Sequence, residues 1–404
     1  MKWIVLTYLL LNPAFYLTGY SARDAQQVCF QLSSVILFAL GMFFENKKVK
    51  FSKLNISIGV LLIVFALTWM RTQSGWLITR NLLYGVLVYI TVIRTLKKED
   101  MLFIFKGVSY LVGLSVIVLA FQVIGWDFRA AQIIGAGGAT IAGVTQESIF
   151  FHRSAMGMYF AQHIPIVASF NIFLAPLLLI PMYYAQSMAA YLGAVIGFGF
   201  FLWFRKRILF WAFSVLVIVA VIAGLNSSAI KRESLTGMNI RLGMWSVIIQ
   251  DIFQTPLGHG LDSFANPKTG VKYYNYQNVD IHETVRLQKD ENGVINGVTE
   301  KDNEYLKRVC NEDGSLTYVD HPHNEYLWVA YEVGLQAWII LGFIFYFIWQ
   351  RFRKSKRDTL TCVSMAVLIC IAIECLLQFP LHLARVGYIL PVILGVFYIA
   401  TEEE

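Results

Sequence analysis

Apolar runs long enough to cross a bilayer recur along this chain and constrain its fold more than any other feature. A transmembrane helix needs about 20 mostly apolar residues. Runs near this length occur at 3–20, 27–44, 54–70, 76–93, 102–125, 149–168, 171–185, 188–204, 208–225, 324–349, 360–378 and 386–401. Only 15% of the residues are charged, whereas soluble proteins carry roughly 25%. We therefore expect an all-α polytopic membrane protein with about twelve transmembrane helices.

The distribution of positive charge indicates a topology. Lysine and arginine cluster in four segments between the apolar runs, ENKKVKFSK (45–53), RTLKKED (94–100), FRKR (204–207) and QRFRKSKRD (350–358). Cytoplasmic segments of membrane proteins are enriched in these residues. Twelve spans with a cytoplasmic N-terminus place all four clusters inside, and the first run then serves as an uncleaved span. The net charge of +7 thus reflects topology, and we expect no nucleic-acid partner.

The same topology divides the chain into three parts. Residues 1–225 would hold transmembrane helices one to nine, and 324–404 would hold helices ten to twelve. Residues 226–323 are polar and turn-rich, so they would form one large periplasmic loop containing short helices. A connection of this length is usually functional or disordered. The cysteines show no CxxC pair or Cys/His ligand spacing, so we expect neither a metal site nor a disulfide framework.

Residues 320–334, DHPHNEYLWVAYEVG, place titratable groups at the start of an apolar helix. Pro322 suits the first helical turn, so His321 or Asp320 would cap the helix and His323 would lie in its first turn. A helix N-terminus favours anions such as phosphate, and its field disfavours imidazolium. His323 should therefore be neutral and able to act as a base. The pattern fits an interfacial cap without chemistry equally well.

Residues 239–258, NIRLGMWSVIIQDIFQTPLG, predict a short amphipathic helix at the outer membrane interface. Its apolar positions recur at helical spacing and are Trp245, Ile248, Ile249, Ile252 and Phe253. Arg241 lies four residues before Trp245 and shares this face. An arginine there either extends its charged end back to water or points into a polar cavity.

Ionisable residues inside apolar runs are costly and mark functional sites by default. Arg80 and Glu374 are two of these, and they can serve a site or pair with each other as a structural bridge. The groups expected at the outer side are Arg153, Arg241, His323 and Arg385. Three arginines and a neutral histidine beside an amphipathic helix suit a lipid-linked phosphate.

The chain resembles the O-antigen ligase and O-antigen polymerase superfamily, whose relatives include bacterial O-linked protein oligosaccharyltransferases. The resemblance is carried by RLGMW (241–245), TPLGHGLDSF (255–264) and HPHNEYLWVAYEVGL (321–335), the last after a long outer loop. HNEYL is somewhat closer to the protein oligosaccharyltransferases. The second arginine of the ligases is missing from AQSMAAYLGA (185–194), where Met188 stands, and Arg153 is the replacement that we consider.

Such proteins transfer a glycan from undecaprenyl diphosphate at the periplasmic face of the bacterial inner membrane. The acceptor is a lipid A–core sugar, another repeat unit or a protein hydroxyl. By resemblance, His323 would deprotonate the acceptor hydroxyl and Arg241 would stabilise the leaving diphosphate, in a single displacement that inverts the anomeric centre. The large loop contains no DxD sequence, so we expect no metal or cofactor. Side chains expected to bind substrate are Arg153, His321, Asn324, Trp245 and Arg385.

Two other classes compete with the transferase. A twelve-span transporter of lipid or polysaccharide predicts internal repeats and helices interrupted near the membrane midplane. The sequence shows no repeat, and its polar groups gather at one face instead. A structural or assembly protein would leave the placement of Arg241 and His323 unexplained. The transferase requires these two residues to converge, although 81 residues separate them in the chain.

Overall fold

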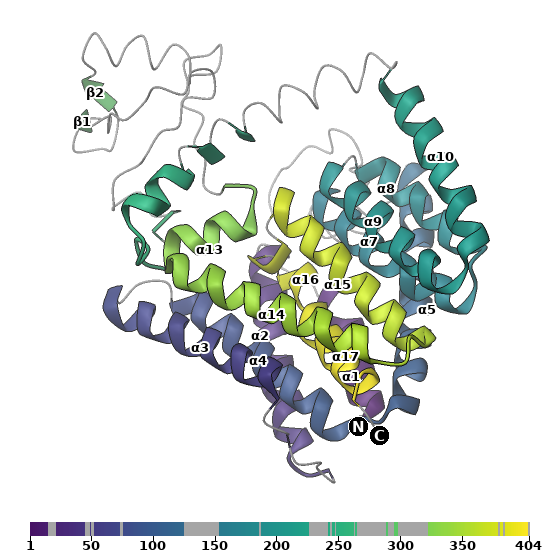
Figure 1. The fold of residues 1–404 in the computed structure, drawn as a ribbon, viewed down its shortest axis with the longest axis horizontal. Coiled ribbons are helices and arrows are strands. Elements are labelled where there is room, and N and C mark those ends of the chain that lie inside the picture. Colours follow the sequence, from purple (N-terminus) through teal and green to yellow (C-terminus); the bar gives the residue numbers. More distant parts are fainter. Residues whose placement is uncertain are drawn as a thin grey trace. The chain divides into compact units, whose positions relative to one another are not determined.

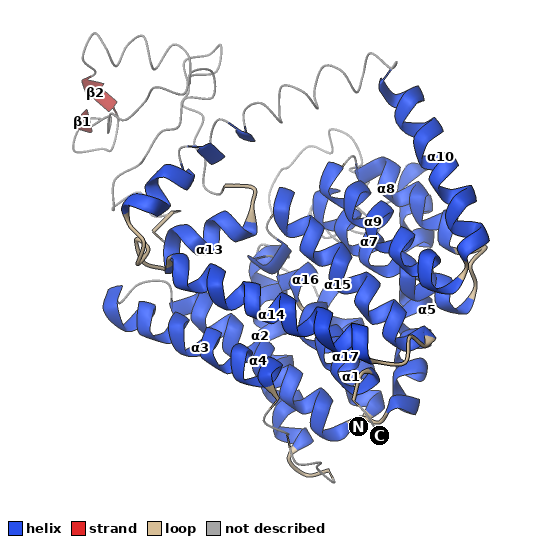
Figure 2. Ribbon diagram, in the orientation of Figure 1, coloured by secondary structure: helices blue, strands red, loops and turns tan. Residues whose placement is uncertain are grey.

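The computed structural model describes residues 1–14, 22–44, 49, 52–72, 76–124, 153–185, 187–225, 241–242, 245–246, 248–261, 263–264, 288–289, 295–297, 322–378, 380–382 and 384–402. Helices dominate these residues (Figures 1 and 2). The longer ones are α1 (Lys2–Ala14), α2 (Ala22–Gly41), α3 (Lys53–Thr72), α4 (Trp76–Thr95), α5 (Lys98–Val123), α7 (Arg153–Phe170), α9 (Met188–Arg205), α10 (Arg207–Leu225), α14 (Leu335–Lys354), α15 (Thr359–Leu377) and α17 (Ile389–Ala400). The expected α-helical class is confirmed.

Short elements complete the described chain. They are η1 (Ala175–Leu178), α8 (Leu179–Ala185), α13 (Glu325–Val333), η3 (Pro380–His382), α16 (Ala384–Gly387) and the antiparallel strands β1 (Gln288–Lys289) and β2 (Ile295–Gly297). Both strands lie within the expected large loop, for which short helices but no strands were predicted.

Five described helices are long and apolar enough to cross a membrane, namely α3, α5, α9, α14 and α15. This fits an α-helical membrane protein but not the expected count of about twelve spans. One reason is that predicted spans are interrupted. The run 324–349 breaks at Gly334 into α13 and α14, and the run 171–185 becomes the 3-10 turn η1 followed by the seven-residue α8. Pro176 and Pro181 in that run disfavour one continuous helix.

The chain divides into two compact units. The first comprises Met1–Gly59, Arg80–Val217 and Phe343–Glu404, and the second comprises Val60–Thr79 and Ile218–Gly342. The second unit contains Arg241 and His323, so it is described with the candidate site.

Three of the four basic segments meet in the first unit. The Arg205 guanidinium, at the end of α9, donates to the Arg357 carbonyl at 3.3 Å and to the Thr359 hydroxyl at 2.6 Å. The Lys98 ammonium, at the start of α5, pairs with the Asp358 carboxylate at 2.7 Å. The segments 94–100, 204–207 and 350–358 therefore share one end of this unit, as the topology prediction requires.

The core of the first unit is the packing of α9 and α7 against α15 (Figure 1). Gly193 and Gly197, one turn apart on α9, face α15, and a Cβ atom at Gly197 would lie 2.2 Å from the Cys370 sulfur and 2.7 Å from the Ala366 carbonyl oxygen. The Cys370 thiol in turn donates to the Gly193 carbonyl at 3.1 Å. Small residues at this spacing let two helix backbones approach closely, as in membrane helix pairs.

The pairing of Arg80 with Glu374, one of the two alternatives considered for these residues, is not formed. The Glu374 carboxyl instead accepts a hydrogen bond from the Gln162 amide of α7 at 2.6 Å. Within the described residues, Arg80 Nε is buried without a hydrogen-bond partner. The structural-bridge interpretation of Arg80 is therefore wrong, because the hydrogen bond to Glu374 comes from Gln162 of α7.

Gly197→Ala tests the close packing of α9 on α15. The new methyl group would overlap the Cys370 sulfur and the Ala366 carbonyl, and overpacking of this kind costs about 1–3 kcal/mol. We expect a lower midpoint of thermal unfolding for the detergent-solubilised protein. Gly199→Ala is the matched control, since its methyl carbon would meet only aromatic carbons, at 3.7 and 3.8 Å. Equal midpoints for the two variants would contradict this packing.

Candidate functional site

His323 lies immediately before α13 in an unusual backbone conformation. Its φ of +50° makes it the only non-glycine residue with positive φ in the part of the chain that the structure describes. Histidine tolerates this left-handed region better than bulky or branched residues do. The residue is partly exposed, so its side chain is not enclosed by the described part of the protein.

The helix cap differs from the one predicted. Asn324 is the N-cap of α13, and its side-chain oxygen accepts a hydrogen bond from the Leu327 N–H at 3.0 Å. The expectation that His321 or Asp320 caps the helix, with His323 in its first turn, is wrong. Asparagine is among the best N-cap residues because its short side chain reaches the free N–H groups. Asn324 was expected to bind substrate, and in the structure it is buried at the cap.

The described residues between 241 and 254 are helical, as predicted. Ile248 and Ile252 are fully buried against α13, and Trp245 packs beside them. The rest of the predicted stripe faces outward, since Ile249 and Phe253 are 38% and 64% exposed. This helix therefore has one apolar face against α13 and a second that the described residues leave uncovered.

One hydrogen bond links this helix to the residue before His323. The Trp245 indole N–H donates to the Pro322 carbonyl at 2.8 Å. Arg241 lies one helical turn before Trp245, and its partial burial lowers the pKa of the guanidinium from its usual value. Arginine nevertheless stays charged at neutral pH. A cation and an imidazole thus lie on two segments that contact each other, although they are far apart in the sequence.

The break between α13 and α14 holds these segments in place. Gly334 has φ +103° and ψ 176°, a conformation nearly restricted to glycine. The last carbonyls of α13 accept hydrogen bonds from another loop, since the His259 and Gly260 N–H groups donate to Tyr331 and Glu332, each at 2.9 Å. The Leu335 N–H donates in return to the Pro256 carbonyl at 2.9 Å. The loop 256–261 therefore replaces the helical partners that the break removes.

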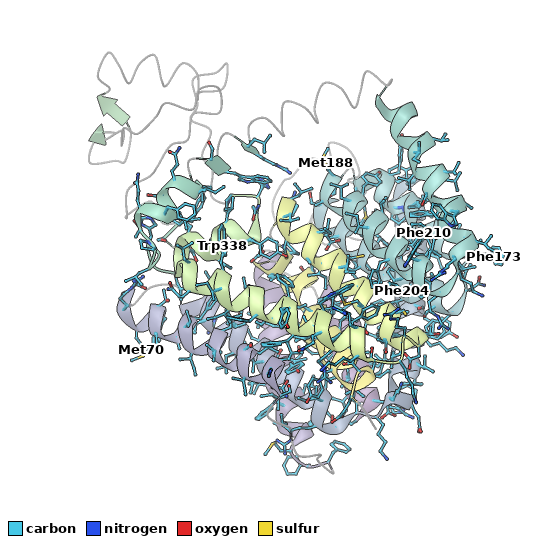
Figure 3. The ribbon with its side chains drawn as sticks, viewed as in Figure 1. Met70, Phe173, Met188, Phe204, Phe210 and Trp338 are labelled. Atoms are coloured by element: carbon cyan, nitrogen blue, oxygen red, sulfur yellow. The ribbon has the colours of Figure 1, made fainter. Side chains whose placement is uncertain are left out.

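Two further contacts brace this junction. The Arg71 guanidinium, near the end of α3, donates to the Leu257 and Gly258 carbonyls, both at 2.9 Å. On the other side, the Trp338 indole of α14 donates to the Tyr326 carbonyl of α13 at 2.7 Å (Figure 3). The structure thus brings Arg71 and this loop together.

A polar cluster that the sequence analysis missed joins the Arg241 helix to α13. The Asp251 carboxylate lies 3.0 Å from His259 Nε2, and the His259 ring stacks on the Tyr331 ring with centroids 4.4 Å apart. Burial raises the pKa of the Tyr331 hydroxyl, and the neighbouring carboxylates of Asp251 and Glu332 raise it further. Tyr331 therefore stays protonated and can donate to Asp251. The sequence could have indicated this cluster, because Asp251 lies three positions after Ile248 and so shares the helix face that packs on α13.

Arg153 and Arg385 belong to the other unit. Arg153 begins α7 and Arg385 lies in α16, and both side chains fall outside the described residues. His321 also lies outside the described residues. Of the predicted site residues, the structure thus brings together Arg241, Trp245 and the His323–Asn324 pair.

This arrangement suits an anionic ligand whose reaction involves a proton. A guanidinium binds phosphate oxygens through paired N–H groups, and an imidazole can accept a proton near neutral pH. Within the described residues, no group of three or more His, Cys, Asp or Glu side chains is placed to hold a metal ion.

Gly334→Ala tests the importance of the helix break. A Cβ atom at this position would lie 2.5 Å from the Pro256 carbonyl oxygen, and positive φ adds strain, so we expect a loss of about 2–4 kcal/mol in stability. Thermal unfolding in detergent measures this loss. Gly342→Ala on α14 is the control, because its Cβ would meet nothing within 4 Å. A Gly334→Ala protein as stable as this control would show that the break is dispensable.

No protein-family model matches this chain, and no curated protein matches it. The resemblance to the O-antigen ligase and polymerase superfamily accordingly rests on the three sequence stretches quoted above.

Proposed function

We propose that this protein is a multi-pass membrane glycosyltransferase that moves a saccharide from undecaprenyl diphosphate to an acceptor hydroxyl. The reaction takes place at the periplasmic face of the bacterial inner membrane, where the segment 226–323 lies. The acceptor is a lipid A–core sugar, a further glycan or a protein hydroxyl. The observation that carries the proposal is the Trp245–Pro322 hydrogen bond, because it joins the Arg241 helix to the segment that holds His323.

Each residue has a defined task in this reaction. Arg241 binds the diphosphate oxygens and offsets the negative charge that grows on them as the sugar leaves. His323 accepts the proton of the acceptor hydroxyl. The bond between the acceptor oxygen and the anomeric carbon forms while the bond from that carbon to the diphosphate oxygen breaks. The electron pair of the broken bond goes to the diphosphate, and the anomeric configuration inverts.

The outward face of the Arg241 helix supports a donor that is anchored in lipid. Leu242, Ile249 and Phe253 recur at helical spacing and are all exposed. A short helix with an apolar face of this kind lies in the membrane interface. Arg241 then stands at the depth of lipid phosphates, which is where the diphosphate of an undecaprenyl carrier is found.

A transporter of lipid or polysaccharide is the second candidate. The break at Gly334 is an interrupted helix, which transporters use near the midplane. Here α14 alone is 20 residues long and can cross the membrane after the break. The interruption therefore belongs at the membrane edge, which favours the transferase.

His323→Ala and Arg241→Ala test the assigned roles. We expect each to lower glycan transfer about 100-fold or more, since losing a base or a charge-stabilising donor typically costs that much. The assay uses purified full-length protein, an undecaprenyl-diphosphate glycan and each of the three acceptor classes, in EDTA. Gln254→Ala, on an exposed position of the same helix, is the control and should retain activity. If folded His323→Ala protein transferred glycan at the wild-type rate, His323 would not be the general base.

Trp245→Phe tests the link between the two segments. The variant keeps an aromatic ring but loses the hydrogen bond to Pro322, worth about 1 kcal/mol of stability. Because small displacements slow transfer strongly, we expect transfer to fall about 10-fold. The matched variant is Trp328→Phe, whose lost bond to Glu332 at 2.8 Å lies within α13 alone. Equal transfer rates for the two variants would show that the Trp245 contact does not position the site.

A further inference from the structure

A carboxyl group lies fully buried in the first unit, and the proposed transfer reaction does not use it. Glu374 belongs to α15, a membrane-length helix, and has no exposed surface. Its hydrogen-bond partner among the described residues is an uncharged side chain, since Gln162 Nε2 of α7 donates to Glu374 Oε2 at 2.6 Å. No lysine or arginine among the described side chains forms an ion pair with it. Burying an ionised carboxylate without a cation is strongly unfavourable.

The helices packed around Glu374 contribute no described cationic partner. From α9, Gly193 approaches so closely that a Cβ atom there would lie 3.3 Å from Glu374 Oε1. Cys370, one turn earlier on α15, directs its thiol to the Gly193 carbonyl. Two other titratable groups of these helices have separate contacts. On α7, His163 Nδ1 lies 2.6 Å from the Tyr159 carbonyl, and on α17 the Tyr398 ring lies under the Arg351 guanidinium.

Two oxygen atoms of this pair have no hydrogen-bond donor within the described residues. They are Glu374 Oε1 and Gln162 Oε1, and both are buried. Each is an acceptor when the carboxyl group is ionised, so neither can satisfy the other. A carboxylic acid, by contrast, carries one O–H donor. Gln162 Nε2–H already donates to Glu374 Oε2, and a proton on Glu374 Oε1 would supply the O–H donor that Gln162 Oε1 lacks.

We propose that Glu374 is a proton-binding site inside the helical bundle, and that the bound proton joins Glu374 Oε1 to Gln162 Oε1. One proton then accounts for both unsatisfied oxygens and removes the buried charge. The proton also joins α7 to α15, which are neighbours in the core of the first unit. This site is independent of Arg241 and His323, so its test does not depend on the proposed transferase activity.

The proton makes stability depend on pH in a defined direction. At neutral pH the native state holds a proton that the unfolded chain releases, so the native state binds more protons than the unfolded state. Stability therefore falls as pH rises. Glu374→Gln removes this dependence, because an amide at position 374 can form the same two-bond pair with Gln162 and does not titrate.

Infrared spectroscopy of the full-length protein in lipid tests the proposal directly. We expect a carboxylic-acid C=O stretching band at neutral pH that is lost in Glu374→Gln and kept in Glu99→Gln, the matched change at an exposed position. Thermal unfolding from about pH 5 to about pH 9 should show a declining midpoint for the wild type relative to Glu374→Gln. The absence of an acid band from the wild type, or its persistence in Glu374→Gln, would overturn the proposal.

A second measurement needs only the wild type and so does not depend on the folding of a variant. A lipophilic carbodiimide reacts with protonated carboxyl groups in apolar surroundings. The acid O–H adds across one C=N bond, and the product rearranges to a stable N-acylurea with no leaving group. Mass spectrometry should place the adduct on Glu374 at neutral pH and find none on Glu99. An unlabelled Glu374 under conditions that label it in acid would show an ionised carboxylate and refute the site.

Discussion

The candidate site depends on how the protein satisfies the backbone groups at the break between α13 and α14. A helix that ends in a buried place leaves carbonyls without donors, and such groups are costly. The loop 256–261 supplies the missing N–H groups to Tyr331 and Glu332. Because the loop also continues the Arg241 helix, the contacts that permit the break fix the position of that helix. The same loop therefore satisfies the backbone carbonyls at the end of α13 and positions the Arg241 helix.

The contacts across this junction are of two kinds. Apolar contacts bury surface, and polar contacts set the position of the helix relative to α13. Ile248 and Ile252 bury the helix face against α13, which favours association without a precise register. The Trp245 indole then forms a hydrogen bond with Pro322, just before α13, and the Asp251 carboxylate forms one with Tyr331 of α13. Directional bonds of this kind select one register from the several that apolar contact allows. The left-handed backbone at His323 is held from both sides, by the Pro322 carbonyl contact and by the Asn324 cap.

The sequence predicted the helical class and the helix after Arg241, because apolar periodicity is a local signal. The meeting of this helix with the His323 segment was only a requirement of the transferase hypothesis. The sequence did not predict the cap at Asn324. Asp320, His321 and Asn324 are all polar, so the local sequence does not distinguish among them, and the structure shows that Asn324 accepts from the Leu327 N–H. The break at Gly334 was missed because its hydrogen-bond donors come from a distant loop.

Other errors also trace to contacts between distant parts of the chain. The partner of Glu374 is Gln162, which lies 212 residues away, and nothing in either local sequence indicates the pair. Ile249 and Phe253 were predicted to share one apolar stripe with Ile248 and Ile252, whereas only the latter two are buried. A helix beside a membrane can leave apolar residues on two faces, so hydrophobicity alone does not tell which face packs on protein.

The central claim is that Arg241 and His323 act on one transition state, and a double-mutant cycle tests it most directly. Transfer rates are measured for the wild type, the two single alanine variants and the double variant, under identical conditions. Residues that act together are strongly non-additive, so the account predicts a double variant about as slow as the slower single variant. Effects that multiply would mean that the two residues act independently, and would contradict a shared site.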